Sequence, residues 1–283
     1  MSGLARPEIL ATTEWLAEHL GRSGVRILDA RWRPDRTGAD VHRAGHIPGA
    51  FSVDWRSDLV DMDQSGDAIR VASPGRVAAT AGRAGIGDET TIVIYDDTQG
   101  LYAARVWWTF RTYGAEHVRI LDGGFPAWEA EGRPIERGTG ETPPEPLTPF
   151  TPRGPNRLHL TTSDVRGLLG APGVTLLDAR APAEYRGFEG NTRRLGHIPG
   201  AINVPVGSMH AAGSQRLREG NDLRDRLHAA NVSRGSRMVA YDGSGVAAAK
   251  LAFVLSLLGH DDVAVYDGGW AEWGNRLDLP VDR

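Results

Sequence analysis

The feature that most constrains this chain is an internal repeat, because four motifs occur twice in the same order. The first copies are LDAR at 28–31, GHIPGA at 45–50, IVIYDD at 92–97 and LDGGFPAW at 121–128; the second copies are LDAR at 177–180, GHIPGA at 196–201, MVAYDG at 238–243 and YDGGWAEW at 266–273. The two copies of each motif lie 145 to 151 residues apart. Ordered matches at nearly constant spacing predict two homologous domains in tandem.

A proline-rich stretch separates the two copies. The segment ETPPEPLTPFTPRGPN at 141–156 holds six prolines. Proline fixes the backbone angle φ and removes a hydrogen-bond donor, so such a stretch suits neither a helix nor a central strand. We therefore expect an N-terminal domain at 1–140, an extended linker at 141–157 and a C-terminal domain at 158–283.

Each half alternates short apolar segments with helical ones. Strands are predicted at 25–30, 91–96, 174–179 and 237–242, and a helix is predicted at 247–258, ending before Gly259. This alternation predicts an α/β fold in which each domain is a mainly parallel sheet flanked by helices. Ligands of such folds bind beyond the carboxyl ends of the strands.

Composition excludes several classes of function. The net charge is −4 and no long run carries one sign, which argues against nucleic acid or an anionic membrane surface as partner. No apolar run is long enough to cross a membrane and no leader is recognised, so a cytoplasmic location is expected. The only lysine, Lys250, is expected to face solvent. The chain has no cysteine, which excludes a disulfide, a thiolate metal site and a thiol nucleophile.

The strongest candidate site is the loop formed by Asp242, Gly243, Ser244, Gly245, Val246 and Ala247. It leaves a predicted strand and enters a predicted helix. Glycines let the backbone curl tightly, so that successive N–H groups and the helix N-terminus form a cradle for an anion. A generic strand-to-helix connection would look much the same, and that alternative stays open.

At these residues the sequence resembles the rhodanese family, the thiosulfate and 3-mercaptopyruvate sulfurtransferases. The resemblance covers nearly the whole chain and rests on LDARW at 28–32, YDD at 95–97 with AARVWW at 103–108, LDARAPAEYRG at 177–187, GHIPGAINVP at 196–205 and YDGGWAEWGNR at 266–276. It implies two tandem rhodanese-like domains, of which only the C-terminal one carries the active loop. It also implies a small sulfur-containing anion as substrate and a thiol or cyanide, including a thiol protein, as sulfur acceptor, with no cofactor or metal.

The sequence departs from the family at the position that matters most. The family's nucleophilic cysteine falls at Asp242, and a carboxylate cannot carry a transferable sulfur. We expect Asp242 to fill the anion cradle and to be kept ionised by backbone N–H groups. Persulfide transfer is therefore predicted to be absent. Two alternatives stay open: the chain is a non-catalytic module that binds an anion or a protein, or the aspartate replaces a native cysteine of an active enzyme.

The resemblance also suggests supporting residues. Ser244 matches a serine that assists proton handling together with a histidine of the first domain, here His46, although His46 and His197 both fit a structural role in their HIPG turns. Asp178 matches an aspartate near the active loop that bonds a substrate-binding arginine.

The family's own substrate-binding arginine falls at Glu184, which reverses the charge at that position. Arg186, Arg193 and Arg194 lie close by in the sequence, and they are candidates to replace the lost charge as binders of the substrate anion. Solvated surface arginines are the alternative. Tryptophans at matched places in both halves are expected in the core.

Overall fold

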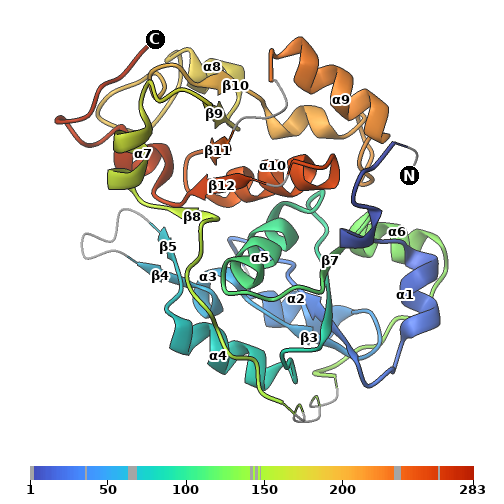
Figure 1. The fold of residues 1–283 in the computed structure, drawn as a ribbon. Helices are drawn as coiled ribbons and strands as arrows, with labels where there is room; N and C mark the ends of the chain where they lie inside the picture. Colours follow the sequence, from blue (N-terminus) through green and yellow to red (C-terminus); the bar gives the residue numbers. More distant parts are fainter. Residues whose placement is uncertain are drawn as a thin grey trace.

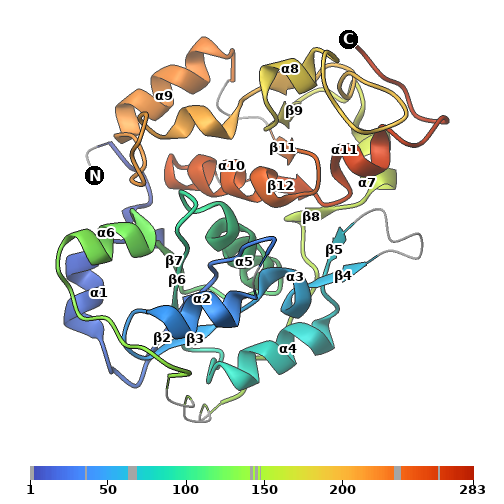
Figure 2. The same cartoon turned by 180° about the vertical axis from the view of Figure 1, so that it is seen from behind.

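The structure is a computed structural model that describes residues 3–35, 37–62, 69–140, 143, 146, 148–232, 237–260 and 262–283. It contains two five-stranded sheets, one in each half of the chain, and neither sheet takes a strand from the other half. Figures 1 and 2 show the C-terminal half lying above the N-terminal half, with one long helix of each half between the two sheets.

The N-terminal sheet has the strand order β1-β7-β6-β2-β3, and all of its strands are parallel. The strands are β1 (Leu10–Ala11), β2 (Val25–Asp29), β3 (Ala50–Ser52), β6 (Thr91–Tyr95) and β7 (Val118–Leu121). Helices α1 (Thr13–His19), α2 (Gly38–Ala44), α3 (Trp55–Asp58), α4 (Pro74–Arg83), α5 (Leu101–Thr112) and α6 (Gly124–Ala130) flank it, with a 3₁₀ turn at Pro7–Ile9.

The C-terminal sheet repeats this topology with the order β10-β9-β11-β12-β8, again all parallel. Its strands are β8 (His159–Leu160), β9 (Val174–Asp178), β10 (Ile202–Asn203), β11 (Arg237–Tyr241) and β12 (Val263–Tyr266). Its helices are α7 (Thr162–Leu168), α8 (Pro182–Tyr185), α9 (Gly220–Ala229), α10 (Val246–Leu257) and α11 (Gly269–Trp273), with a 3₁₀ turn at Val206–Met209. The predicted α/β fold of two parallel-sheet domains is confirmed.

The central strands are apolar because helices cover both faces of each sheet. In β6 and β11 the last four residues are all buried. Both strands end one residue earlier than predicted, since Asp96 and Asp242 already belong to the following loops. The register places Asp29 beside Tyr95 and Asp178 beside Tyr241, so the carboxyl ends of neighbouring strands meet at one edge of each sheet.

The interface between the halves is built from α5 and α10, which lie against each other in both views. Most side chains of both helices are buried, and Trp107 of α5 meets Phe253 of α10 edge to face with ring centroids 5.1 Å apart. A helix that is apolar all round is expected to be enclosed by protein, which is what α10 shows. The tryptophans expected in the core, at 107, 108, 128, 270 and 273, are all buried.

A buried ion pair crosses this interface. Arg105 Nη1 of α5 lies 2.7 Å from Asp267 Oδ1, which follows β12, and neither side chain is more than 1% exposed. The guanidinium also lies over the Trp108 ring, 4.6 Å from its centroid. The pair is extended by the hairpin of β4 (Val60–Met62) and β5 (Ile69–Val71), since the Val71 amide donates to Asp267. An ion pair thus joins the two domains within the interface that α5 and α10 form.

The proline-rich segment lies along the N-terminal half where the structure describes it. Phe150 is buried against Phe110 of α5, and the amides of Arg153 and Asn156 donate to carbonyls at the end of that helix. Residues 141, 142, 144, 145 and 147 lie outside the described residues. The domain bounds 1–140, 141–157 and 158–283 stay predictions.

We predict that Arg105→Met lowers the free energy of unfolding by about 3–5 kcal/mol, because it leaves the Asp267 carboxylate buried without its cation. Chemical denaturation measures the change. The double variant Arg105→Met/Asp267→Asn serves as control and is expected to lose less than the sum of the two single variants. A loss below about 1 kcal/mol for Arg105→Met would show that the pair does not hold the interface.

Candidate functional site

The candidate site is the loop 242–247, which connects β11 to α10. Asp242 is 6% exposed, and its carboxylate turns back into the loop. The Gly245 amide donates to Oδ1 at 2.5 Å and the Ala247 amide donates to Oδ2 at 3.2 Å. The carboxylate thus lies inside the ring of amides that the strand–loop–helix connection creates.

Burial and the amides act in opposite directions on this carboxyl. Burial raises the pKa of Asp242, while N–H groups of Ala247, Ser244, Ala248 and Gly245 lower it, and the net shift is upward from the ordinary value of 3.8. The amides therefore offset only part of the cost of burying the charge. Asp267 differs, because burial is outweighed by Arg105, His159 and the Val71 amide together, which bring the pKa of that carboxyl below its ordinary value.

Glycine is required where two segments approach each other closely. A Cβ atom added to Gly245, whose φ is +81°, would lie 2.7 Å from Arg105 Nη1. A Cβ atom added to Gly269, whose φ is +57°, would lie 2.6 Å from the Asp242 carbonyl oxygen. Amides of α11 then reach the loop, since Trp270 donates to the Asp242 carbonyl at 2.6 Å and Ala271 donates to the Gly243 carbonyl at 3.0 Å. The repeated DGG motif thus packs directly against the loop, and the two residues that follow it donate backbone hydrogen bonds to the loop.

The N-terminal half contains the same device. Asp96 follows β6, is 1% exposed and accepts four backbone hydrogen bonds of 2.8 to 3.0 Å, from Thr98, Gly100, Tyr102 and Ala103. Its loop, 96–102, is one residue longer between the aspartate and the glycine that precedes the helix. Gly124 repeats the role of Gly269, because its Cβ would lie 2.2 Å from the Asp96 carbonyl oxygen. An aspartate that accepts the loop amides is therefore common to both halves.

Ser244 and His46 belong to different halves of the chain. Ser244 is half-buried in the C-terminal loop. His46 lies in the N-terminal half, where its Nδ1 contacts the His42 carbonyl oxygen at 2.9 Å and its ring stacks on His42. His197 holds the matching place in the C-terminal half and contacts the Tyr185 carbonyl oxygen at 2.9 Å. The equivalent contacts favour the structural role for both histidines.

Asp178 also has a structural partner. Arg180 donates from Nε to Asp178 Oδ1 at 3.0 Å and from Nη2 to the Gly196 carbonyl at 2.8 Å, and both side chains are buried. Asp29 and Arg31 repeat this pair in the N-terminal half. The pair ties the end of β9 to the GHIPG turn next to the site.

The three candidate arginines have different surroundings. Arg186 is exposed and lies over the Phe188 ring, and Arg193 is exposed with its backbone amide bonded to Asn275 Oδ1. Arg194 instead donates its guanidinium to backbone carbonyls of Leu279, Trp273 and Arg276. Its N–H groups thus tie down the C-terminal segment, which leaves Arg186 and Arg193 as the exposed cations of the set.

The sequence analysis did not single out Arg105, whose side chain reaches from α5 into the C-terminal half and donates to the Gly245 carbonyl at 3.2 Å. The spacing of the repeat could have indicated its importance, because a shift of 145 residues aligns Arg105 with Lys250 and Asp122 with Asp267. The expectation that Lys250 faces solvent is wrong: it is 4% exposed because α10 is enclosed between its own sheet and α5.

Among the residues that the structure describes, no three His, Asp or Glu side chains gather as metal ligands would, and no helix has the length and apolar character needed to cross a membrane.

Comparison with known proteins follows the same division of the chain. A model of the rhodanese-like domain matches residues 12–131 and 161–276. "Putative thiosulfate sulfurtransferase SseB" of Mycobacterium tuberculosis is 38% identical over 288 residues, covering 99% of this chain and 98% of that protein. Human 3-mercaptopyruvate sulfurtransferase is 34% identical, covering 96% and 95%. The crystal structure of SseA from Escherichia coli, a 3-mercaptopyruvate sulfotransferase, superposes with a TM-score of 0.82 at 29% identity, covering 93% and 98%.

We predict that the stability of the chain depends on pH through Asp242. Its pKa is above 3.8 in the folded protein, so the folded state binds more protons between 3.8 and that higher value. The free energy of unfolding that this group contributes is then lost as pH rises through the window. In Asp242→Asn the titration is gone, so the stability of this variant relative to the parent chain should increase with pH above 3.8.

Urea denaturation at a series of pH values measures this difference, in which all other titrating groups cancel. Any hydrogen bond that the carboxamide loses adds an offset that does not change with pH. A difference that decreases as pH rises would mean that the loop amides lower the pKa of Asp242 and outweigh its burial.

Proposed function

Because the chain belongs to the rhodanese family, we propose that it is a sulfurtransferase-type protein whose loop holds a carboxylate where its relatives carry sulfur, and that it does not transfer persulfide as the chain stands. The observation that carries the proposal is the Asp242 carboxylate, which already accepts the loop amides that would hold a sulfur anion. With no cysteine anywhere in the chain, no other side chain can take the nucleophile's place.

The chemistry explains why a carboxylate cannot substitute. In the sulfurtransferase reaction a thiolate attacks the outer sulfur of thiosulfate, the sulfur–sulfur bond breaks and sulfite leaves with the electron pair. Cyanide or a thiol then attacks the outer sulfur of the persulfide and restores the thiolate. An oxygen nucleophile at Asp242 offers no persulfide to the second step, although the loop backbone around it is built for an anion.

The outer side of the loop stays available for binding. Gly243, Ser244 and Ala247 are half-buried, while the carboxylate itself is enclosed. We include in the proposal that a small sulfur-containing anion, thiosulfate or 3-mercaptopyruvate, approaches this side, with Arg186 and Arg193 as the nearby exposed cations in the sequence. A thiol protein is the expected acceptor wherever a cysteine stands at 242.

The second candidate function is a non-catalytic module that binds a protein partner. The observation in its favour is Phe188, whose ring is 75% exposed beside the Arg186 guanidinium at 5.6 Å. An exposed aromatic ring next to an arginine is typical of protein contact surfaces. The two functions differ in whether a cysteine at 242 restores turnover.

We predict that Asp242→Cys forms thiocyanate from cyanide with thiosulfate or 3-mercaptopyruvate, because the loop amides and the helix N-terminus stabilise a thiolate at that position. Colorimetric detection of thiocyanate measures the activity for each donor separately. Asp242→Ser is the matched control and should stay inactive, since it opens the same space without a thiol. An inactive Asp242→Cys that folds normally would favour the non-catalytic module.

We also predict that Asp242→Gly binds sulfite more tightly than the parent chain, by about tenfold or more, because removal of the carboxylate frees the loop amides and a negative charge. Isothermal titration calorimetry measures both affinities. Asp96→Gly is a useful control, since it opens the equivalent loop of the other half. Equal sulfite affinity in Asp242→Gly and the parent chain would mean that Asp242 does not occupy the anion cradle.

A further inference from the structure

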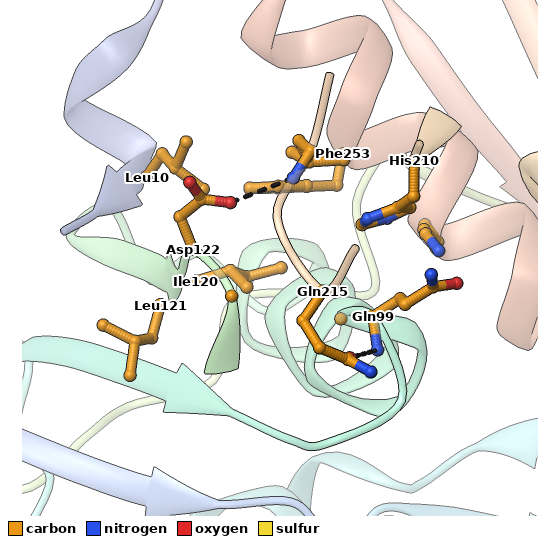
Figure 3. Close-up of a pocket in the computed structure, with 12 residues that line it drawn as sticks. Leu10, Gln99, Ile120, Leu121, Asp122, His210, Gln215 and Phe253 are labelled. Atoms are coloured by element: carbon orange, nitrogen blue, oxygen red, sulfur yellow. Dashed lines mark hydrogen bonds between the residues drawn. The ribbon is translucent and has the colours of Figure 1, made fainter. Parts of the chain in front are cut away.

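A small cavity lies between the domains, beside the N-terminal loop 96–102. Its volume is about 20 Å³, and its walls come from both halves of the chain. Leu10 and Ile120 form apolar wall from the N-terminal half and Phe253 from α10, while Lys250, His210 and Gln99 contribute polar groups. Figure 3 shows the side chains of His210 and Gln99 pointing into the same space. A cavity of this size holds roughly one water-sized particle.

Lys250 is the unusual group in this cavity. Its side chain is 4% exposed, and among the described residues it forms no hydrogen bond and no ion pair. Burial lowers the pKa of its amine to about 8, with the Asp96 charge acting in the opposite direction. A buried ammonium with three donors and no acceptor is costly unless a ligand or water accepts from it.

Comparison of the two halves shows that Lys250 lacks the carboxylate partner that its counterpart has. The 145-residue spacing makes Lys250 the counterpart of Arg105 and Asp122 the counterpart of Asp267. Arg105 pairs with Asp267 across the interface at 2.7 Å. Asp122 instead binds the Leu217 amide at 3.1 Å and lies 3.5 Å from Arg216. Both halves therefore keep a cation at this position, but Asp122 contacts Leu217 and Arg216 rather than Lys250.

His210 offers the complementary atom. Its Nδ1 contacts the Arg216 carbonyl oxygen at 2.9 Å, and since a carbonyl only accepts, Nδ1 carries the proton. Burial and the nearby Lys250 and Arg218 charges lower the pKa of His210 to about 4, so the ring is neutral near pH 7. Nε2 is then a buried lone pair, and it has no hydrogen-bond partner among the described residues. The cavity thus presents one strong donor and one free acceptor.

The other charges around the cavity already have partners. Asp96 accepts four backbone hydrogen bonds from its own loop. Asp122 is held by Leu217 and Arg216, and Arg218 binds Asp222 and two backbone carbonyls. Among the described charges at this cavity, Lys250 is the one whose side chain has no hydrogen-bonded or ion-paired partner, and only the Asp96 charge acts on it from a distance.

We propose that this cavity binds hydrosulfide, a monovalent anion with a single heavy atom that keeps one proton, held between Lys250 Nζ and His210 Nε2. The anion accepts from the ammonium, and its S–H donates to the imidazole lone pair. The site is separate from the C-terminal loop and does not depend on the function proposed for Asp242. A halide has the right size and charge but no proton, so it would face the lone pair unless His210 were protonated.

The experiment is a titration of the ¹⁵N-labelled chain with sodium hydrosulfide near neutral pH, observing the Nε2 resonance of His210. A chain without cysteine has no thiol or disulfide that hydrosulfide could attack, so the change reports binding. We expect a saturable shift of Nε2 toward the position of a hydrogen-bonded nitrogen. Sodium bromide should bind more weakly than hydrosulfide, by about tenfold or more. Its binding should become tighter as pH falls toward the pKa of His210, because the protein takes up a proton when bromide binds.

Two variants separate binding from general salt effects. Lys250→Met should weaken hydrosulfide binding by about tenfold or more, and its melting temperature without ligand should rise because a buried unpaired cation is gone. Arg111→Met removes a cation of α5 that bonds the carbonyls of Ala115 and Glu116 outside the cavity, and it should bind as the parent chain does. An unmoved Nε2 resonance, or one that moves equally in Lys250→Met, would mean that the cavity holds water only and would overturn the proposal.

Discussion

The structure depends on one local arrangement: an aspartate at the end of a central parallel strand accepts the backbone amides of the loop that follows. Asp96 and Asp242 both do so, and in both halves a helix begins directly behind the loop. Such a loop is an anion site by construction, because its N–H groups converge and the helix dipole points at them. In this chain the anion is part of the polypeptide. The same geometry that suits sulfur chemistry therefore becomes a closed structural element.

The two loops meet the opposite domain through one cation each, and the difference between these cations separates the halves chemically. Arg105 is neutralised by Asp267 and also donates to the Gly245 carbonyl, so it stiffens the C-terminal loop across the interface. Lys250 lacks such a partner and faces a small cavity with His210. The repeat thus supplies two equivalent cation positions, Arg105 and Lys250. The absence of an ion pair at Lys250 gives that position the capacity to bind a ligand.

Much of the fold followed from the sequence because it depends on patterns that repeat. The apolar strands and the loop after β11 lie where the sequence predicted them, except that all four predicted strands end one residue early. The interface did not follow, since residue type alone does not say that α5 and α10 pack on each other. The apolar circumference of α10 could have indicated that Lys250 is buried. Contacts between distant segments could be identified only from the three-dimensional structure. An example is the hydrogen bonds that Arg194 donates to carbonyls near the C-terminus.

The central claim is that the C-terminal loop is filled by its own carboxylate and cannot carry sulfur. Intact-mass spectrometry of the unaltered chain after incubation with thiosulfate or 3-mercaptopyruvate tests it directly. The account predicts a mass identical to that of the untreated chain, since no side chain can hold a sulfane sulfur. A population heavier by one sulfur atom, which reverts when cyanide is added, would contradict it.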